Sequence, residues 1–437
     1  MRQFVVGMVV AVVVGGTPRG LAAQEPDSIA IARLKAQVEA ITRELERLAL
    51  GDEVVSRADT AMMGFGPAAS KIYRAREGVS LGGYGEFLLD HFADTDETGN
   101  PANRRSQLDA LRGIVYVGYK FSDRILFNSE IEFEHASTEQ GGAVSLEFAY
   151  LDVRLNRYLG IRGGLLLLPV GWVNEMHEPP TFLGARRPET EQRILPTTWR
   201  ENGVGVFGVA GPLTYRAYLV TGFDAIGGGS SEASGFAAAG LRGGRQKGAR
   251  ALAETWAGVG RVDLLPIPGL VAGASAYYGK AGQGAANPLA SGTTIGANTF
   301  IGELHAEYRA GGVWLRALGA VAAVQNVVEI NAARGLSGSE SVGERLWGWY
   351  AEVGYNVLRH VRTTQELLPY VRYEALDTQA RVPEGYTANP ANAQTVVSIG
   401  AAWKPIGPVV LKGDYQIRRN DAFTGVNQLS VTLGYLF

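Results

Sequence analysis

Apolar and polar residues alternate one by one along most of the chain from residue 79 onward. The stretch "ILFNSEIEFEH", which begins at residue 125, separates the two kinds most clearly. Its apolar positions are Ile125, Phe127, Ile131 and Phe133, and its polar positions are Asn128, Glu130, Glu132 and Glu134. Successive side chains of a β-strand point to opposite faces, so this period predicts strands with one apolar and one polar face. Soluble antiparallel sandwiches and membrane barrels share that pattern, and the connections distinguish them.

The connections between the predicted strands fall into two length classes that alternate strictly. Short turns lie at 121–124, 156–157, 211–212, 266–269, 310–312, around His360, and at 405–408. Longer polar or glycine-rich segments lie at 94–104, 136–142, 174–198, 225–251, 281–297, 329–345, 377–393 and 420–426. Seven short and eight long connections join sixteen strands. Outer-membrane barrels have this asymmetry, so we predict an all-β membrane protein whose residues 79–437 form a 16-stranded antiparallel transmembrane β-barrel.

The chain ends on the apolar alternation "QLSVTLGYLF". An even number of strands brings both ends of the barrel to the periplasmic side, so this last strand should pair with the first and close the wall. Its alternate apolar side chains should then face lipid, with Tyr435 and Phe437 in the aromatic belt at the membrane interface.

The first residues have the layout of a secretory signal peptide. Arg2 precedes an apolar run over residues 4–14, and the small residues Ala22 and Ala23 precede Gln24. The apolar run is too short to cross a bilayer, which takes about 20 residues, so we expect residues 1–23 to be a signal peptide and not an anchor. No long apolar segment follows, and a mature protein in a membrane must therefore be a closed barrel.

Residues 24–50 predict a short periplasmic coiled-coil helix. Apolar residues recur at alternating spacings of three and four, at Ile31, Leu34, Val38, Ile41, Leu45 and Leu48. Fewer than three heptads are marginal in water, so the coil requires chains that are gathered by oligomerisation elsewhere. The alternative is an amphipathic helix that lies on its own protein. Residues 51–78, with several glycines and Pro67, are expected to be a linker.

Composition narrows the class of partner. The chain of 437 residues is 46% apolar, which is enough to bury a large surface. Its formal net charge of -2 argues against nucleic acid, which requires a basic face. It contains no cysteine, which fits a chain that crosses an oxidising compartment without disulfides.

The third long segment, residues 174–198, carries the densest set of candidate functional residues. In general porins the third outer loop folds into the lumen, and opposed charges there create a field across the pore. Four prolines restrict this segment, which favours an ordered loop. The candidates for a pore constriction are Arg186, Arg187, Glu189, Glu191, Arg193, Arg200 and Glu201. The alternative is a loop that caps the outer mouth and makes surface ion pairs of little energetic weight.

Other polar residues are expected on the lumen side of the wall. These are Asn128, Glu130, Glu132 and Glu134, together with Arg372 and Glu374, which alternate with apolar neighbours. The basic cluster "LRGGRQKGAR" at residues 241–250 is expected to attract anions, or else to be a solvated mobile loop. Glu175, His177 and Glu178 do not have the spacing of two metal ligands on one helix face, and we expect neither a metal nor a cofactor.

Several stretches resemble the phosphate-selective porin O and P family of trimeric 16-stranded barrels. They are "LEFAYLDVRLNRYLGIRGGLLLLPVGW", "LWGWYAEVGYNVL", "LPYVRYEALD" and "VLKGDYQIRRNDAFTGVNQLSVTLGYLF". The resemblance implies a homotrimer in the bacterial outer membrane, with a C-terminal strand, ending in Phe437, that the outer-membrane assembly machinery reads. Phosphate binders of the family rely on a run of pore-facing arginines with lysine, which this chain does not match residue by residue.

These observations favour a non-enzymatic porin, a water-filled channel through which small hydrophilic solutes or ions, including anions such as phosphate, diffuse passively. One alternative is a non-conducting structural or adhesive barrel that is tethered by its coiled coil. Another is a barrel lipid hydrolase, which needs an aligned Ser, His and carboxylate, but the chain has no G-x-S-x-G motif. The expected partners are bilayer lipid, two further copies of the chain, the assembly machinery and small solutes, without nucleic acid.

Overall fold

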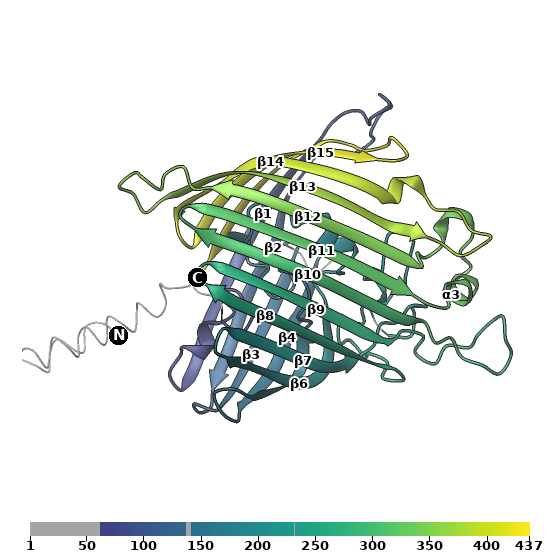
Figure 1. The fold of residues 1–437 in the computed structure, drawn as a ribbon, viewed down its shortest axis with the longest axis horizontal. Coiled ribbons are helices and arrows are strands. Elements are labelled where there is room, and N and C mark those ends of the chain that lie inside the picture. The colour runs from purple at the N-terminus through teal and green to yellow at the C-terminus, as the bar shows by residue number, and fades with distance from the viewer. Residues whose placement is uncertain (1–61, 137–140, 231) are drawn as a thin grey trace, which may run out of the picture. The chain divides into compact units, whose positions relative to one another are not determined.

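The computed structural model describes residues 62–136, 141–230 and 232–437, and these residues form a closed barrel of sixteen antiparallel strands (Figure 1). The predicted signal peptide, the coiled coil and the first part of the linker lie outside the described residues. The strands are β1 (Gly78–Phe92), β2 (Gln107–Lys120), β3 (Ile125–Glu134), β4 (Ala143–Arg154), β5 (Gly160–Leu167), β6 (Arg200–Ala210), β7 (Leu213–Thr221), β8 (Trp256–Ile267), β9 (Leu270–Lys280), β10 (Asn298–Ala310), β11 (Val313–Val324), β12 (Arg345–Tyr355), β13 (Glu366–Arg381), β14 (Ala393–Ile406), β15 (Val409–Asn420) and β16 (Gln428–Leu436). The predicted strand number is confirmed.

The last strand closes the barrel against the first. β16 pairs with β1 in a register that joins Leu436 to Tyr84 and Leu429 to His91. The backbones of Phe437 and Gly83 extend this ladder with two hydrogen bonds of 2.9 and 3.0 Å. Closure leaves no strand with unpaired backbone groups, which a wall in hydrocarbon requires.

Alternation along each strand separates an apolar exterior from the interior. In β12, Trp347, Trp349 and Val353 are exposed on the outside, while Tyr350 and Glu352 are buried inside. β3 divides in the same way, because Phe133 is 47% exposed and Glu130 is fully buried. An outward apolar band with a polar interior is the arrangement of a barrel that faces lipid.

The connections define two ends of the barrel, which we name the turn end and the loop end. Seven short connections, 121–124, 155–159, 211–212, 268–269, 311–312, 356–365 and 407–408, lie at the turn end, with the C-terminus. The eight long loops lie at the other end, where α3 (Val327–Arg334) is seen in Figure 1. The third and fourth of these loops are named L3 (168–199) and L4 (222–255).

Short helical pieces interrupt the loops and the segment before β1. They are η1 (Lys71–Tyr73), η2 (Pro179–Thr181) and α2 (Glu189–Arg193) in L3, η3 (Arg242–Gly244) in L4, α3, η4 (Gly338–Glu340) and η5 (Pro390–Asn392). Within the described residues, no helix is both long and apolar enough to cross a membrane.

Candidate functional site

L3 crosses the interior and is attached to the wall on opposite sides. Toward β3 and β7, His177 Nε2 lies 3.0 Å from Glu130 Oε1, and Glu175 pairs with Arg216 at 3.0 Å. These contacts join a loop to buried wall charges, which would be costly without partners. L3 is therefore held inside the lumen by an ion pair and by a contact between a histidine and a buried carboxylate.

The other attachments reach the strands near the chain end. The backbone N–H of Ala185 donates to Asp414 at 2.6 Å, and Lys412 Nζ donates to the carbonyl of Gly184 at 2.9 Å. Thr432 Oγ1 donates to the carbonyl of Ala185 at 2.9 Å. L3 thus spans from β3 and β7 to β15 and β16.

Glu191 holds L3 in its folded shape. Its carboxylate accepts backbone N–H bonds from Trp172 and Val173 at 2.9 and 2.7 Å, and a bond from the Tyr350 hydroxyl of β12 at 2.5 Å. Glu191 is fully buried, and burial raises the pKa of its carboxyl. The carboxyl joins the start of L3, α2 and the wall.

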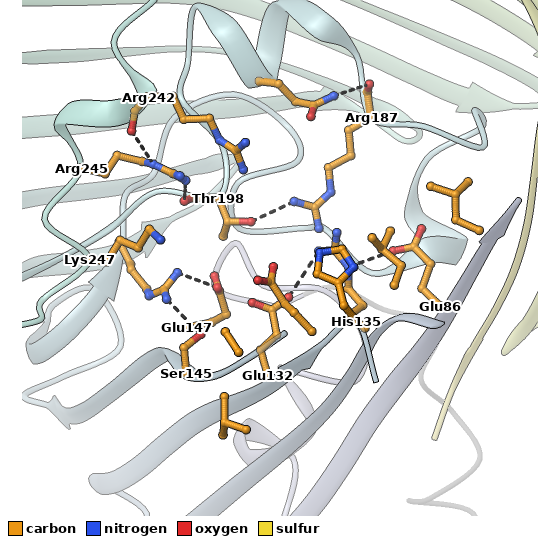
Figure 2. A pocket seen from close by; sticks show the side chains of 18 of the residues that line it. Glu86, Glu132, His135, Ser145, Glu147, Arg187, Thr198, Arg242, Arg245 and Lys247 are labelled. Carbon is orange, nitrogen blue, oxygen red and sulfur yellow. Dashed lines mark hydrogen bonds and ion pairs between the residues drawn. The ribbon is translucent and has the colours of Figure 1, made fainter. Parts of the chain in front are cut away.

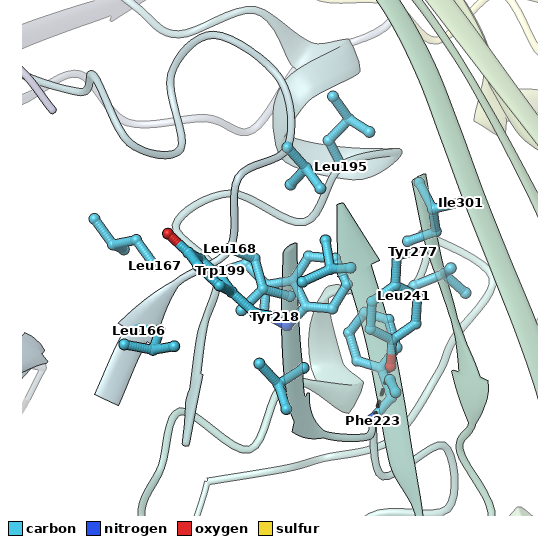
Figure 3. Packing of buried hydrophobic residues seen from close by; sticks show 14 of the residues in the cluster. Leu166, Leu167, Leu168, Leu195, Trp199, Tyr218, Phe223, Leu241, Tyr277 and Ile301 are labelled. Carbon is cyan, nitrogen blue, oxygen red and sulfur yellow. Dashed lines mark hydrogen bonds between the residues drawn. The ribbon is translucent and has the colours of Figure 1, made fainter. Parts of the chain in front are cut away.

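Aromatic packing fixes L3 to L4 (Figure 3). The ring of Trp199 stacks on Phe223 at a centroid distance of 4.3 Å and lies 4.7 Å from Tyr277 of β9. Figure 3 shows Leu241 of L4 beside these rings. Part of the interior is therefore an apolar core, and water has access only to the remaining space.

A cavity of about 490 Å³ opens at the loop end between L3, L4 and strands β1 to β4 (Figure 2). Its acidic lining comes from the wall, with Glu86, Glu132, Glu134 and Glu147, and from L4, with Glu232, which pairs with Lys247 at 2.9 Å. Its basic lining comes from β2, β6 and the loops: Arg112, Arg186, Arg187, Arg200, Arg242, Arg245 and Lys247.

Two arginines on the wall form ion pairs with three of the four wall carboxylates. Arg112 Nε lies 3.1 Å from Glu86, and its Nη1 lies 3.7 Å from Glu132. Arg200 Nη1 lies 2.6 Å from Glu147. Arg112 is thus shared by two carboxylates, and Glu134 has no ion-pair partner among the described residues, so part of the negative charge of the wall still faces the cavity.

Three arginines on the loops are not paired with a carboxylate among the described residues. Arg187 donates to the Thr198 hydroxyl at 2.9 Å, Arg242 donates to the Thr197 carbonyl at 3.0 Å, and Arg245 donates to carbonyls that include that of Thr198. Among the described residues, none of the three forms an ion pair with a carboxylate. Arg187 also has a buried Nη2 without a hydrogen-bond partner in this part of the chain.

Burial is the main cause that lowers the pKa values of these three arginines. Burial, and then the charge of Arg242, lower the pKa of Arg245 to about 9. Burial and neighbouring guanidinium groups also lower the pKa values of Arg187 and Arg242. An anion between these groups would be attracted by all three.

Only some of the residues predicted from the sequence meet at this cavity. Those that line it are Arg186, Arg187, Arg200, Glu132 and Glu134. Those that do not are Glu189, Glu191, Arg193, Glu201, Asn128, Glu130, Arg372 and Glu374. Arg186 forms an ion pair with Asp90 of β1, so its charge is compensated.

The remaining predicted residues are engaged within the protein. Glu189 pairs with Arg193 at 2.8 Å and with Arg418 at 2.6 Å; burial opposes ionisation, but these two cations lower its pKa to about 2. Glu201 is buried and accepts the backbone N–H of Gln246 in L4 at 2.8 Å. Its carboxylate therefore fastens L4 to β6 and is not free for a solute.

Arg372 and Glu374 point into the interior, beneath L3. They lie 3.0 Å apart, and Glu374 accepts the backbone N–H of Thr190 at 3.3 Å. Arg372 donates to the carbonyl of Arg186 at 3.3 Å. Both side chains support the loop from below.

Sequence reasoning missed Glu86, Arg112 and Glu147 as lining residues. A β-bulge at Glu130 and Ile131 shifts the pairing of β3 with β4, and both Glu147 and the next residue, Phe148, are buried. The bulge breaks the alternation that would otherwise have marked Glu147 as inward-facing.

A second cavity, of about 830 Å³, lies at the turn end and shares no lining residue with the first. Thr181 lines the turn-end cavity and Ala185 lines the loop-end cavity. Between them in the chain, Phe182 and Leu183 are buried. Residues 181–185 of L3 are thus the partition between the two cavities.

No protein-family model matches the chain. Among solved structures, OmpF of Salmonella typhi, in complex with daunomycin, has a TM-score of 0.52 at 15% identity, over 82% of this chain and 97% of that chain. OmpTdeltaL8, a loop-deletion mutant of an outer membrane protein of Vibrio cholerae, has a TM-score of 0.50 at 13% identity, over 82% and 99%. The fold is that of the outer-membrane porins.

A curated protein of Aquifex aeolicus (strain VF5), described as an uncharacterized protein, is 39% identical over 370 residues, which cover 83% of this chain and 80% of that protein. The chain belongs to the same family as this Aquifex protein.

Proposed function

We propose that the protein is a porin of the outer membrane, through which small hydrophilic solutes diffuse passively. The apolar exterior, the polar interior and the porin fold support this proposal. A loop that partitions the lumen supports it as well, because such a loop narrows a barrel of sixteen strands to a selective passage. Residues 181–185 form that partition.

The same channel prefers anions. The observation that carries this step is the set of Arg187, Arg242 and Arg245, three guanidinium groups at one cavity without a carboxylate partner among the described residues. A narrow passage with low-dielectric walls focuses their potential and raises the local concentration of anions. Guanidinium groups also bind phosphate and carboxylate in two-pronged geometry, so phosphate is among the solutes proposed.

Kinship with the phosphate-selective porin O and P family stays part of this proposal. The strand patterns of the sequence and the arginine set support it. The remaining proposals are secretion by residues 1–23, a periplasmic coiled coil over 24–50, a homotrimer, and assembly through the strand that ends in Phe437.

Reversal potentials in planar bilayers under a KCl gradient test the anion preference. We expect the unmodified channel to favour chloride, and a variant with Arg187→Gln, Arg242→Gln and Arg245→Gln to shift toward potassium. The shift should shrink at 1 M salt, where the screening length is about 3 Å. Inorganic phosphate should reduce the chloride current of the unmodified channel and have less effect on the variant.

A matched control removes charge elsewhere at the loop end. Arg105 and Arg250 are exposed and do not line the cavity, so Arg105→Gln with Arg250→Gln should leave the reversal potential nearly unchanged. Equal shifts in both variants would mean that general surface charge sets selectivity. A folded protein without any conductance, retained with the cell wall after detergent, would favour the tethered structural barrel.

A further inference from the structure

Residues 62–77, which the sequence assigns to a linker, lie against the inner wall at the turn end of the barrel. We name residues 62–76 the N-terminal segment. It begins with a tight turn in which the backbones of Met62 and Phe65 exchange hydrogen bonds of 3.2 and 2.9 Å, and it continues into η1. Phe65 and Ile72 are each only 1% exposed. The segment is therefore a packed part of the interior.

An aromatic and charged pocket of the wall receives Phe65. Its ring lies 5.3 Å from that of Phe148 and 5.6 Å from that of Tyr150, both on β4. The guanidinium of Arg162 on β5 lies 4.8 Å from the Phe65 ring, in cation–π contact. This pocket is shaped for one aromatic side chain.

A hydroxyl network binds Tyr73 beside that pocket. Tyr73 donates to Asp152 at 2.7 Å, and Arg162 Nη2 donates to the Tyr73 oxygen at 2.7 Å. Arg162 and Asp152 also pair directly at 2.7 Å. The Arg162–Asp152 pair is formed within the wall and does not involve Tyr73.

Polar side chains of L3 and the wall form hydrogen bonds with the backbone of the N-terminal segment. Glu178 of L3 accepts the N–H groups of Ala68 and Ala69 at 3.1 and 2.9 Å. Asn128 Nδ2 donates to the carbonyl of Ala69 at 2.9 Å. A Cβ on Gly66 would lie 2.6 Å from the Glu178 carboxyl carbon, so a larger residue there would displace this carboxylate from the backbone N–H groups that it accepts.

The N-terminal segment occupies part of the space between the partition of L3 and the turn end of the barrel. Pro67 lines the turn-end cavity together with Pro180 and Thr181 of L3. The wall residues that bind the segment, such as Asn128 and Asp152, lie near the turn ends of β3 and β4. Removal of the segment would therefore enlarge the space that leads from the partition to the turn end.

We propose that the inner wall of β2 to β5, with Glu178 of L3, is a docking site for residues 62–76, and that release of this segment widens the channel. The inference rests on the proposed channel function. All contacts of the segment are noncovalent, and the pocket residues Arg162 and Asp152 remain paired when it leaves. The occupant is a segment of the same chain, so its local concentration is high and the docked state dominates.

A reversible covalent lock tests this inference in the full chain. A Cβ on Gly118 would lie 3.1 Å from the Cβ of Ile72, so a movement of a few tenths of an ångström brings the pair into the roughly 3.5–4.5 Å range of a disulfide, and the chain has no other cysteine. We expect channels with Ile72→Cys and Gly118→Cys to stay at a low conductance when oxidised. On reduction they should gain transitions to a level at least twofold higher. Each single-cysteine variant serves as a control.

Gly66→Ala should weaken docking without a change in the wall, and channels of this variant should spend more time at the high level. Gly113→Ala is the matched control, since a Cβ on Gly113 meets no atom within 4 Å. Identical conductance in the oxidised, reduced and Gly66→Ala channels would overturn the inference.

A readout without current separates this inference from the channel itself. Ala69 is 3% exposed in the docked state, so an Ala69→Cys variant should react with a polymer-linked maleimide only after release. Ala402→Cys, a buried wall position, is the unreactive control. Labelling of position 69 that becomes faster with Gly66→Ala supports docking and release, whether or not current flows. A protein that labels in this way but conducts no current would refute the channel function and leave the docking inference intact. Equal, negligible labelling at positions 69 and 402 refutes release.

Discussion

The charged side chains of the barrel interior form two groups, those that pair with an opposite charge and those that do not. Arg162 is paired with Asp152 and surrounded by aromatic rings, whereas Arg187, Arg242 and Arg245 donate only to neutral oxygens. Arg245 is buried, Arg187 is half-buried and Arg242 is exposed, so the cost of a buried charge without a partner falls mainly on Arg245. This difference between two sets of arginines is the basis of the proposed anion preference.

At the residue scale, Glu189 should make stability depend on acid. Its pKa is lowered to about 2 from an ordinary 4.5, so its contribution is present above pH 4.5 and is lost as the pH falls toward 2. We expect Glu189→Gln to lower the unfolding temperature at pH 7 and to have little effect near pH 2. Thermal unfolding followed by circular dichroism measures both, and a difference that persists unchanged at pH 2 would contradict the assignment.

At the scale of elements, L3 depends on a few buried contacts that bring distant parts of the chain together. Glu191 joins the first turn of the loop to α2 and to Tyr350, and Trp199 fixes the end of the loop to L4. Short α2 has too few residues to be stable by itself. The loop is therefore ordered by the wall around it.

We expect Glu191→Ala to release L3, because two backbone N–H groups and one hydroxyl lose their acceptor. Trypsin should then cleave after Arg186 or Arg193, while the unmodified loop resists under the same conditions; the bond after Arg187 precedes Pro188 and is not a trypsin site. Tyr350→Phe removes only one of the three bonds and should give an intermediate rate. Resistance of Glu191→Ala equal to that of the unmodified protein would show that other contacts suffice.

The closing strand β16 provides a second test at this scale. Phe437 is 51% exposed and its backbone pairs with Gly83, so Phe437→Lys puts a charge at the lipid-facing end of the seam. Such a charge costs roughly 2 to 4 kcal/mol at the membrane midplane and less near the interface. We expect a reduced yield of assembled barrel with unchanged conductance of the channels that do assemble; equal yields would reject this role.

At the scale of the whole molecule, the exterior of the barrel is apolar, whereas much of its interior is polar and charged. The outward band exposes aromatic and aliphatic residues on every strand, and the interior combines ion pairs, an apolar core and two cavities. Lipid satisfies the exterior, and side-by-side packing of copies would cover part of it. The proposed homotrimer belongs to this scale.

We expect native mass spectrometry of the detergent-solubilised protein to detect trimers. Replacing Leu34 and Ile41, which lie outside the described residues, by Asp should weaken the proposed coiled coil and leave the trimer intact, since barrel contacts hold it. Dissociation to monomers in that variant would assign assembly to the N-terminal helix. Monomers of the unmodified protein would refute the trimer.

The sequence by itself determined the barrel, because strand alternation and loop length are local properties of the chain. The sixteen strands and their closure by the last strand followed from spacing alone, and the structure confirms them. Which charges compensate each other depends on contacts between distant residues. Arg112 meets Glu86 and Glu132, and Arg186 meets Asp90, only after the wall has closed and L3 has folded inward. Tertiary structure alone also decided that residues 62–76 lie in the lumen, since their apolar side chains follow neither the strand nor the helix period and their partners, Glu178, Arg162 and the rings of β4, are distant in the chain.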